Sequence, residues 1–141
     1  MSRLFQIPPE MLDLALAHVG PMIDSAAEYS VGKYKGADVV DAIRKEKMQL
    51  WVVIDDKKKI QAIAITELAL FPQAKVCRFL CATGENAPEW IHLIKEIEDW
   101  AVNEGCTQFQ AECRPGWERL LKSYDYQKTH VILNKEIGDA N

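Results

Sequence analysis

Residues 114–126 read RPGWERLLKSYDY, and this stretch decides the fold that we expect. It predicts a short helix that closes in a tight aromatic turn at Asp125–Tyr126. A strand is expected on its C-terminal side, from Lys128 to Glu136, where the residues THVIL favour β structure. A shorter strand is expected before it, from Thr107 to Glu112. The end of the chain therefore predicts strand, short helix, strand.

A longer helix precedes these elements, from Trp90 to about Asn103. It has an apolar stripe that includes Trp90, Ile91, Ile94, Ile97 and Ala101. A full stripe of this kind indicates a helix that packs on a sheet. If the helix connects neighbouring strands, a right-handed crossover makes the strand at Thr107–Glu112 parallel to the strand before the helix.

The first half of the chain predicts helices and then an antiparallel meander. Pro8–Pro9–Glu10 suits the start of a helix, Gly20–Pro21 is expected to break it, and a second short helix is expected to end near Tyr29. Another helix is expected at Asp38–Arg44. Strands are predicted at 50–54, 60–70 and 74–82, with a turn at 55–59. The fold class is thus α+β: one domain over residues 1–141, with a mixed, mostly antiparallel sheet and helices on both sides.

Composition restricts the partners. The chain has 141 residues and a net charge of −4, which disfavours non-specific binding to nucleic acid. No run approaches the roughly 20 apolar residues of a membrane span, and the start lacks the apolar core of a signal peptide. We therefore expect a cytoplasmic protein that binds neither nucleic acid nor membrane.

The four cysteines resemble a metal site only in part. Cys77 and Cys81 are spaced as C-x3-C, but four residues along a strand span about 13 Å, too far for one zinc ion or one disulfide. We expect both to lie on one face and to fill core space, and no metal site is predicted. Cys106 and Cys113 flank another strand and are separated for the same reason.

The order of elements and the closing segment 114–126 resemble the GNAT (Gcn5-related N-acetyltransferase) fold, across nearly the whole chain. Residues 47–52 and 114–119 also resemble short GNAT-like proteins of tailed phages and prophages. The resemblance implies acetyl-CoA as the cofactor. It places the pantetheine arm along strand backbone near Leu80 and Ala82, and the pyrophosphate at Gly84, Asn86 and Ala87, where the next helix begins.

This chain departs from the family pattern at the pyrophosphate loop. The family loop has the form Arg/Gln-x-x-Gly-x-Gly/Ala, whereas residues 81–90 read CATGENAPEW and keep one glycine, Gly84. Pro88 removes a backbone donor, and Glu85 and Glu89 place negative charge where pyrophosphate would bind. Asn86 is interpreted as an N-cap whose side chain satisfies a donor that phosphate would need.

The catalytic groups are implied by position. Many family members carry a tyrosine four residues before the glycine of the closing Gly-Phe turn, and it protonates the thiolate of departing CoA. With Asp125–Tyr126 aligned on Gly-Phe, Leu121 takes that position, so Tyr124 is the remaining candidate. Glu67 and Glu112 are candidate general bases.

The loop after the N-terminal helices lines the acceptor site in this fold. Here it offers Tyr29, Lys33 and Tyr34, which are equally consistent with a plain surface loop. Two functions follow. One is an acetyl-CoA-dependent N-acyltransferase with a small-molecule or protein amine as acceptor. The other is a catalytically inactive phage protein in the host cytoplasm or virion, which acts as an assembly or interaction module and binds phage structural proteins. With either function the strand expected at Lys128–Glu136 could pair across a homodimer.

Overall fold

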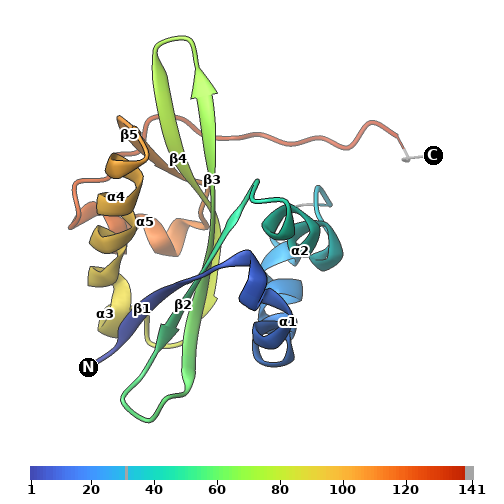
Figure 1. The fold of residues 1–141 in the computed structure, drawn as a ribbon. Coiled ribbons are helices and arrows are strands. Elements are labelled where there is room, and N and C mark those ends of the chain that lie inside the picture. The colour runs from blue at the N-terminus through green and yellow to red at the C-terminus, as the bar shows by residue number, and fades with distance from the viewer. Residues whose placement is uncertain (31, 139–141) are drawn as a thin grey trace.

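The computed structural model describes residues 1–30 and 32–138. Its centre is one five-stranded sheet in the order β1-β2-β3-β4-β5, so every strand lies beside its neighbour in sequence (Figure 1). The strands are β1 (Arg3–Ile7), β2 (Gln49–Ile54), β3 (Ile60–Phe71), β4 (Ala74–Gly84) and β5 (Gln108–Ala111). The first four are antiparallel, and β5 is parallel to β4. The α+β class and the mixed sheet are confirmed.

The strand β1 was not predicted from the sequence. It pairs with β2 from Arg3↔Ile54 to Ile7↔Leu50 and forms one edge of the sheet. Only Leu4 and Ile7 are partly buried, so it lacks the apolar run that marked the central strands.

Helices cover both faces of the sheet, as Figure 1 shows. On one side lie α1 (Leu12–Glu28) and α2 (Gly36–Arg44); on the other lie α3 (Ala87–Trp90), α4 (Ile94–Asn103) and α5 (Pro115–Lys122). Each layer has its own core. Leu12, Ile23 and Ile43 pack on Leu50 and Ile63 on the first face, and Ile97, Ala101 and Leu121 pack on Trp51 and Cys77 on the second.

The predicted break at Gly20–Pro21 is wrong. After one 3₁₀ turn at Pro9–Met11, the helix α1 runs through Pro21 without interruption. Proline removes one backbone donor from a helix, and Pro21 lies on the exposed side. Val19 and Ile23, on the covered side, are each 1% exposed, so packing on the sheet holds the two halves in line.

The helix expected from Trp90 to Asn103 is divided. The short helix α3 and a 3₁₀ turn at Ile91–Leu93 precede α4. Trp90 has φ −127° and ψ −6°, outside the helical range. Its indole N–H donates to the Glu85 carbonyl at 2.7 Å, and its ring packs on Trp117 with centroids 5.8 Å apart. These contacts fix Trp90 and bend the chain at that point.

The strand predicted at Lys128–Glu136 is also wrong for this structure. Residues 127–138 form no strand and are all exposed. In Figure 1 this segment leaves the α5 side, crosses to the side of α2 and extends away from the sheet. The alternating sequence is present, but within the described residues it has no strand beside it.

Candidate functional site

The strands β4 and β5 separate part of the way along the sheet. Their pairing ends at Phe79↔Ala111, whereas β4 continues to Gly84. The next residue, Leu80, is the extra residue of a β-bulge, because Ile65 pairs with Cys81 and Thr66 pairs with Phe79. A bulge bends its strand. It therefore turns the end of β4 away from β5, and the backbone of residues 80–83 has a strand partner only on the β3 side.

The bulge also overturns the prediction that Cys77 and Cys81 share a face. Cys77 lies in the core beneath α4, and Cys81 packs against the core beneath α1 and α2. The extra residue at Leu80 shifts the alternation by one, so the two side chains point to opposite faces.

All four cysteines are free. Burial raises the pKa of Cys77 to about 12 and that of Cys81 to about 11, so both remain thiols at neutral pH. Within residues 1–30 and 32–138, no group of three or more His, Cys, Asp or Glu side chains is arranged to hold a metal ion.

The turn after β4 contains the residues expected at the pyrophosphate. Gly84 lies against β3: a Cβ on it would meet the Ala62 Cβ at 2.4 Å and the Gln61 carbonyl oxygen at 2.5 Å. The backbone N–H of Glu85 donates to the same Gln61 carbonyl at 3.2 Å. The close approach of two strands is thus sufficient to require glycine here, whether or not phosphate binds.

Asn86 stands at the N-cap of α3, but the predicted side-chain cap is wrong. Its backbone has φ 56° and ψ 48°, in the left-handed region, and its side chain makes no capping hydrogen bond. Ala87 begins the helix, so its N–H has no partner within that helix. Pro88 follows without a donor, and the Glu89 carboxylate accepts a hydrogen bond from Gln61 Nε2 at 2.8 Å. The turn therefore keeps few donors and holds one carboxylate close by.

The two candidate bases meet at one arginine. Arg78 on β4 donates to Glu67 Oε1 on β3 at 2.7 Å and forms a second ion pair with Glu112, just after β5. All three side chains lie near the last β4–β5 pairs, where the strands begin to separate. In the described part of the chain, Arg78 Nε is buried and has no hydrogen-bond partner. With two carboxylates and one guanidinium, this cluster carries one excess negative charge.

The N-terminal loop contributes one residue to this region. Tyr29, at the end of α1, lies under the guanidinium of Arg114, whose Cζ is 4.2 Å from the ring centroid. Arg114 is two residues after Glu112, so the C-terminal end of α1 lies against the segment that follows β5. Lys33 is exposed and donates to the Ser30 carbonyl, and Tyr34 packs partly against the core beneath α1 and α2. Val31 in this loop is outside the described residues.

The closing segment has the predicted tight turn. Asp125 has φ 68°, the left-handed conformation that favours glycine, which fits its alignment on the glycine of Gly-Phe. Tyr126 packs edge-on against Phe79, and its O–H donates to Glu98 on α4 at 2.5 Å. Burial, assisted by this hydrogen bond, raises the pKa of Tyr126. Leu121 is buried, and Tyr124 lies after the end of α5, partly buried against the same core.

Sequence reasoning missed Arg78 and Arg114. Arg78 is a charged residue inside the otherwise apolar run VCRFLC, and that interruption was the available signal. Arg114 gave no signal of its own, because its contact with Tyr29 joins segments that are far apart in the sequence.

Comparison with known proteins identifies the fold through solved structures. A scan of protein-family models and a search of curated proteins find no match to this sequence. Solved structures do match. A probable acetyltransferase shares 12% identity at a TM-score of 0.71, with 99% of each chain covered. An aminoglycoside antibiotic 6'-N-acetyltransferase from Acinetobacter baumannii shares 14% at 0.62, covering 98% of this chain and 100% of its own.

A third match is a predicted acetyltransferase from Clostridium acetobutylicum, solved with acetyl-CoA, which shares 13% identity at a TM-score of 0.63 with 96% of each chain covered. None of the helices within residues 1–30 and 32–138 is both long and apolar enough to cross a membrane.

At identities this low, the similarity to these structures concerns the fold. The chain therefore has the α+β fold of the GNAT acetyltransferases.

Proposed function

We propose that this protein is an N-acyltransferase that uses acetyl-CoA and transfers the acetyl group to an amine. The observation that carries the proposal is the separation of β4 from β5 at the Leu80 bulge. It leaves strand backbone free at the place where the fold resemblance puts the acyl donor. The Glu67–Arg78–Glu112 cluster lies beside the same point.

The residues present fit the pantetheine arm of acetyl-CoA better than its pyrophosphate. Beyond Phe79, alternate N–H and C=O groups of Leu80 and Ala82 face away from β3, and an extended amide chain bonds well to such groups. The pyrophosphate would be held by the backbone at Gly84, Asn86 and Ala87. That turn has lost a donor at Pro88 and carries two acids, so we expect binding that depends mainly on the arm.

The bound cofactor would supply a thioester, whose carbonyl carbon the amine attacks. Glu67 would accept the proton that the amine loses when the C–N bond forms. It must first exchange its contact with Arg78, whose remaining partner is Glu112. When the C–S bond breaks, Tyr124 would protonate the departing thiolate, since Leu121 cannot.

The acceptor would approach from the side of α1. Tyr29, Lys33 and Tyr34 are the proposed contacts, and the Tyr29 ring already lies against Arg114. The single excess negative charge of the Glu67–Arg78–Glu112 cluster would attract a protonated amine. A small-molecule or protein amine therefore suits this site better than an anionic acceptor.

The alternative is a protein with this fold and no catalysis, acting as an assembly or interaction module, such as a phage protein in the host cytoplasm or virion. The structure of the loop favours it in one respect: Glu89 and Pro88 occupy the turn where donors for pyrophosphate are needed. In that case Gly84 serves only the contact between β3 and β4.

Calorimetric titration separates the two functions. Acetyl-CoA, CoA and pantetheine are titrated into the full chain. Micromolar binding of acetyl-CoA, about −8 kcal/mol, supports the acyltransferase, and pantetheine should then bind nearly as tightly as CoA. Absence of binding up to millimolar acetyl-CoA refutes it and favours the interaction module.

A charge variant tests the turn itself. The double variant Glu85→Gln with Glu89→Gln removes two negative charges beside the proposed pyrophosphate site. At ~8 Å each charge pair is worth about 0.5 kcal/mol in water, and salt reduces the total, so CoA should bind roughly fivefold more tightly. The matched control, Glu10→Gln with Glu96→Gln, removes the same charge from exposed positions and should change little. Equal effects of the two pairs would show that the turn does not contact the cofactor.

A further inference from the structure

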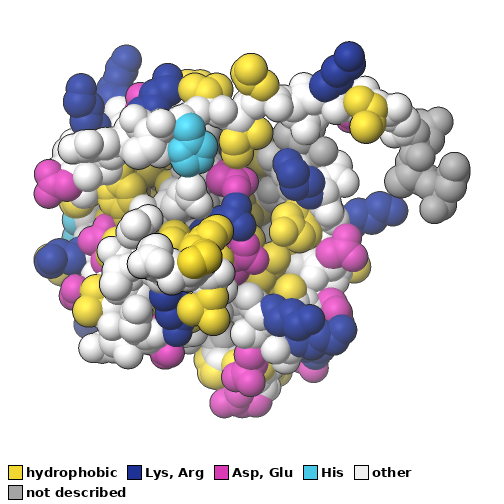
Figure 2. All heavy atoms as spheres, turned by 90° about the horizontal axis from the view of Figure 1, so that it is seen from above, with side chains coloured by type: hydrophobic (Ala, Val, Ile, Leu, Met, Phe, Trp, Pro, Cys, Tyr) yellow, Lys and Arg dark blue, Asp and Glu magenta, His cyan; other side chains and the backbone are white. Residues whose placement is uncertain are grey.

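The segment after Tyr126 has the sequence pattern of a strand but is exposed along its whole described length. All of residues 127–138 are exposed, including Val131, Ile132, Leu133 and Ile137, whose exposed fractions are 63%, 61%, 92% and 92%. Seen from above in Figure 2, the segment stands off from the rest of the molecule. A β-branched, apolar stretch of this length is normally covered, because leaving it in water costs free energy.

The sheet also has an open edge strand, β5, that such a segment could join. β5 is the last strand in the order, and among the described residues only β4 pairs with it. The Glu112 N–H, just after β5, donates to the Phe79 carbonyl of β4 at 3.1 Å, in the same register as the β4–β5 pairs. Since backbone groups alternate along a strand, the N–H groups of Gln108 and Gln110 face β4, and those of Phe109 and Ala111 point to the open side. An unpaired edge of this kind readily accepts another strand.

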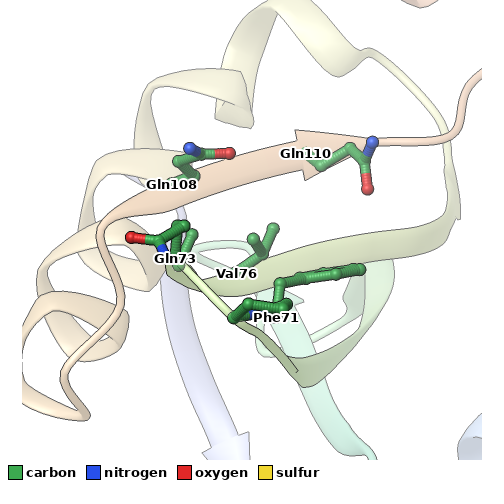
Figure 3. Close-up of a pocket in the computed structure, with 7 residues that line it drawn as sticks. Phe71, Gln73, Val76, Gln108 and Gln110 are labelled. Atoms are coloured by element: carbon green, nitrogen blue, oxygen red, sulfur yellow. The ribbon is translucent and has the colours of Figure 1, made fainter.

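A shallow groove of about 410 Å³ lies on the face of the sheet between β5 and the β3–β4 hairpin. Figure 3 shows Gln108 and Gln110 on β5 along one wall, and Phe71, Gln73 and Val76 of the β3–β4 hairpin along the other. Phe71 and Leu70 at the tip of that hairpin are 53% and 81% exposed. The open edge therefore offers backbone hydrogen bonds to an incoming strand, on the side of β5 away from this groove.

We propose that residues 128–137 pair with the open edge of β5 in a second copy of this chain, so that two copies exchange these segments. Both contacts are then the same, and the exchange closes into a symmetric dimer. It accounts at once for the exposed apolar segment and for the open edge. The inference is independent of whether the protein binds acetyl-CoA.

The start and length of the segment favour a second copy over the segment's own sheet. Tyr126 is fixed against Phe79 and Glu98, and from there the chain runs outward past the sheet (Figure 1). Ten extended residues span roughly 33 Å, about the diameter of a domain of this size. The segment is therefore long enough to leave its own domain and reach the equivalent edge of a neighbour.

Light scattering after gel filtration tests the proposal on the full chain. The expected mass is twice the 16.0 kDa of one chain. The double variant Val131→Pro with Ile132→Pro removes two successive backbone donors, one of which must face β5 in any register. It should weaken self-association by at least about tenfold. Leu133→Asp should also weaken it, whereas Leu14→Asp, at another exposed leucine on α1, should not.

Mixing two defective chains distinguishes exchange from every other arrangement. Ala111→Pro removes a backbone donor from the open edge and leaves the segment intact, whereas the double proline variant spoils the segment and leaves the edge intact. Each alone should be monomeric. Their mixture should form a heterodimer with one intact strand pair. A monomeric full chain, a mixture that stays monomeric, or a dimer that survives both changes would overturn the proposal, and the monomeric results would indicate that the segment folds back on its own β5.

Discussion

Replacing Gly84 with alanine should destabilise the protein at the turn that would hold the cofactor. The added Cβ would lie 2.4 Å from the Ala62 Cβ and 2.6 Å from the Ala62 Cα. Carbon atoms in contact are normally 3.5–4.0 Å apart, so the ends of β3 and β4 must part by about 1 Å.

The magnitude follows from two losses. Overpacking of this kind costs about 1–3 kcal/mol. The 3.2 Å hydrogen bond from the Glu85 N–H to the Gln61 carbonyl would be stretched or broken, which adds about 0.5–1.5 kcal/mol. We therefore expect Gly84→Ala to lower the free energy of unfolding by roughly 2–4 kcal/mol.

Urea unfolding, followed by tryptophan fluorescence and circular dichroism, measures this change. The matched control is Gly116→Ala in α5, where a Cβ would meet no atom within 4 Å, and alanine should stabilise by up to about 1 kcal/mol. In a double-mutant cycle, Ala62→Gly should recover about 1 kcal/mol of the Gly84→Ala loss by removing one clash. A free energy within about 0.5 kcal/mol of wild type for Gly84→Ala would refute the close-packing argument.

Three other results are expected. Tyr126→Phe, which deletes the donor to Glu98, should cost about 1.5–2 kcal/mol in chemical unfolding. Folding raises the pKa of Tyr126. The contribution of its hydrogen bond to the free energy of unfolding is therefore complete below the unfolded pKa of about 10 and is lost as pH rises above it. The free energies of unfolding of wild type and the phenylalanine variant should thus converge at alkaline pH. With a thiol reagent, exposed Cys113 should react quickly in the native protein, and Cys77, fully buried and with its pKa raised to about 12, only on unfolding; equal rates would contradict the structure. At Asp125, φ 68° makes glycine nearly neutral but valine costly by more than about 1 kcal/mol in thermal melts.

The elements that the sequence predicted correctly are those with strong local signals. Strands β2, β3 and β4 are apolar, β-branched runs separated by turn residues, and the structure keeps them almost at their predicted bounds. The turn at 55–59 was equally predictable, because the Asp55 carboxylate accepts hydrogen bonds from the Lys57 and Lys59 N–H groups at 2.9 Å. Such signals depend on neighbours in the chain, so one sequence is enough to find them.

Apart from the Asn86 cap, the main failures concern contacts between distant segments. The Leu80 bulge depends on how β3 and β4 pair, and no residue in the run marks it. Pro21 is tolerated because Val19 and Ile23 pack on the sheet, a tertiary effect that overrides the local preference. The segment 128–136 has the right alternation for a strand, yet a strand exists only where another strand lies beside it.

The candidate site was predictable in composition but not in arrangement. Glu67 and Glu112 were both identified as possible bases, but their shared partner Arg78 on β4 brings together Glu67 of β3 and Glu112 just after β5. This pairing changes the chemistry, because neither carboxylate is free until the arginine contact is exchanged.

Charge is what divides the two proposed functions. In the proposed acyltransferase, the excess negative charge at the cluster would attract a cationic amine, whereas Glu85 and Glu89, just after the end of β4, would repel a polyanionic pyrophosphate. A cofactor-dependent enzyme can tolerate this conflict if the arm, held by strand backbone near Leu80 and Ala82, supplies most of the binding free energy. The affinity of pantetheine relative to CoA measures that share directly. If the arm alone binds poorly, the acids at the turn leave acetyl-CoA without a site, and the separated strands are then a feature of the fold rather than of a reaction.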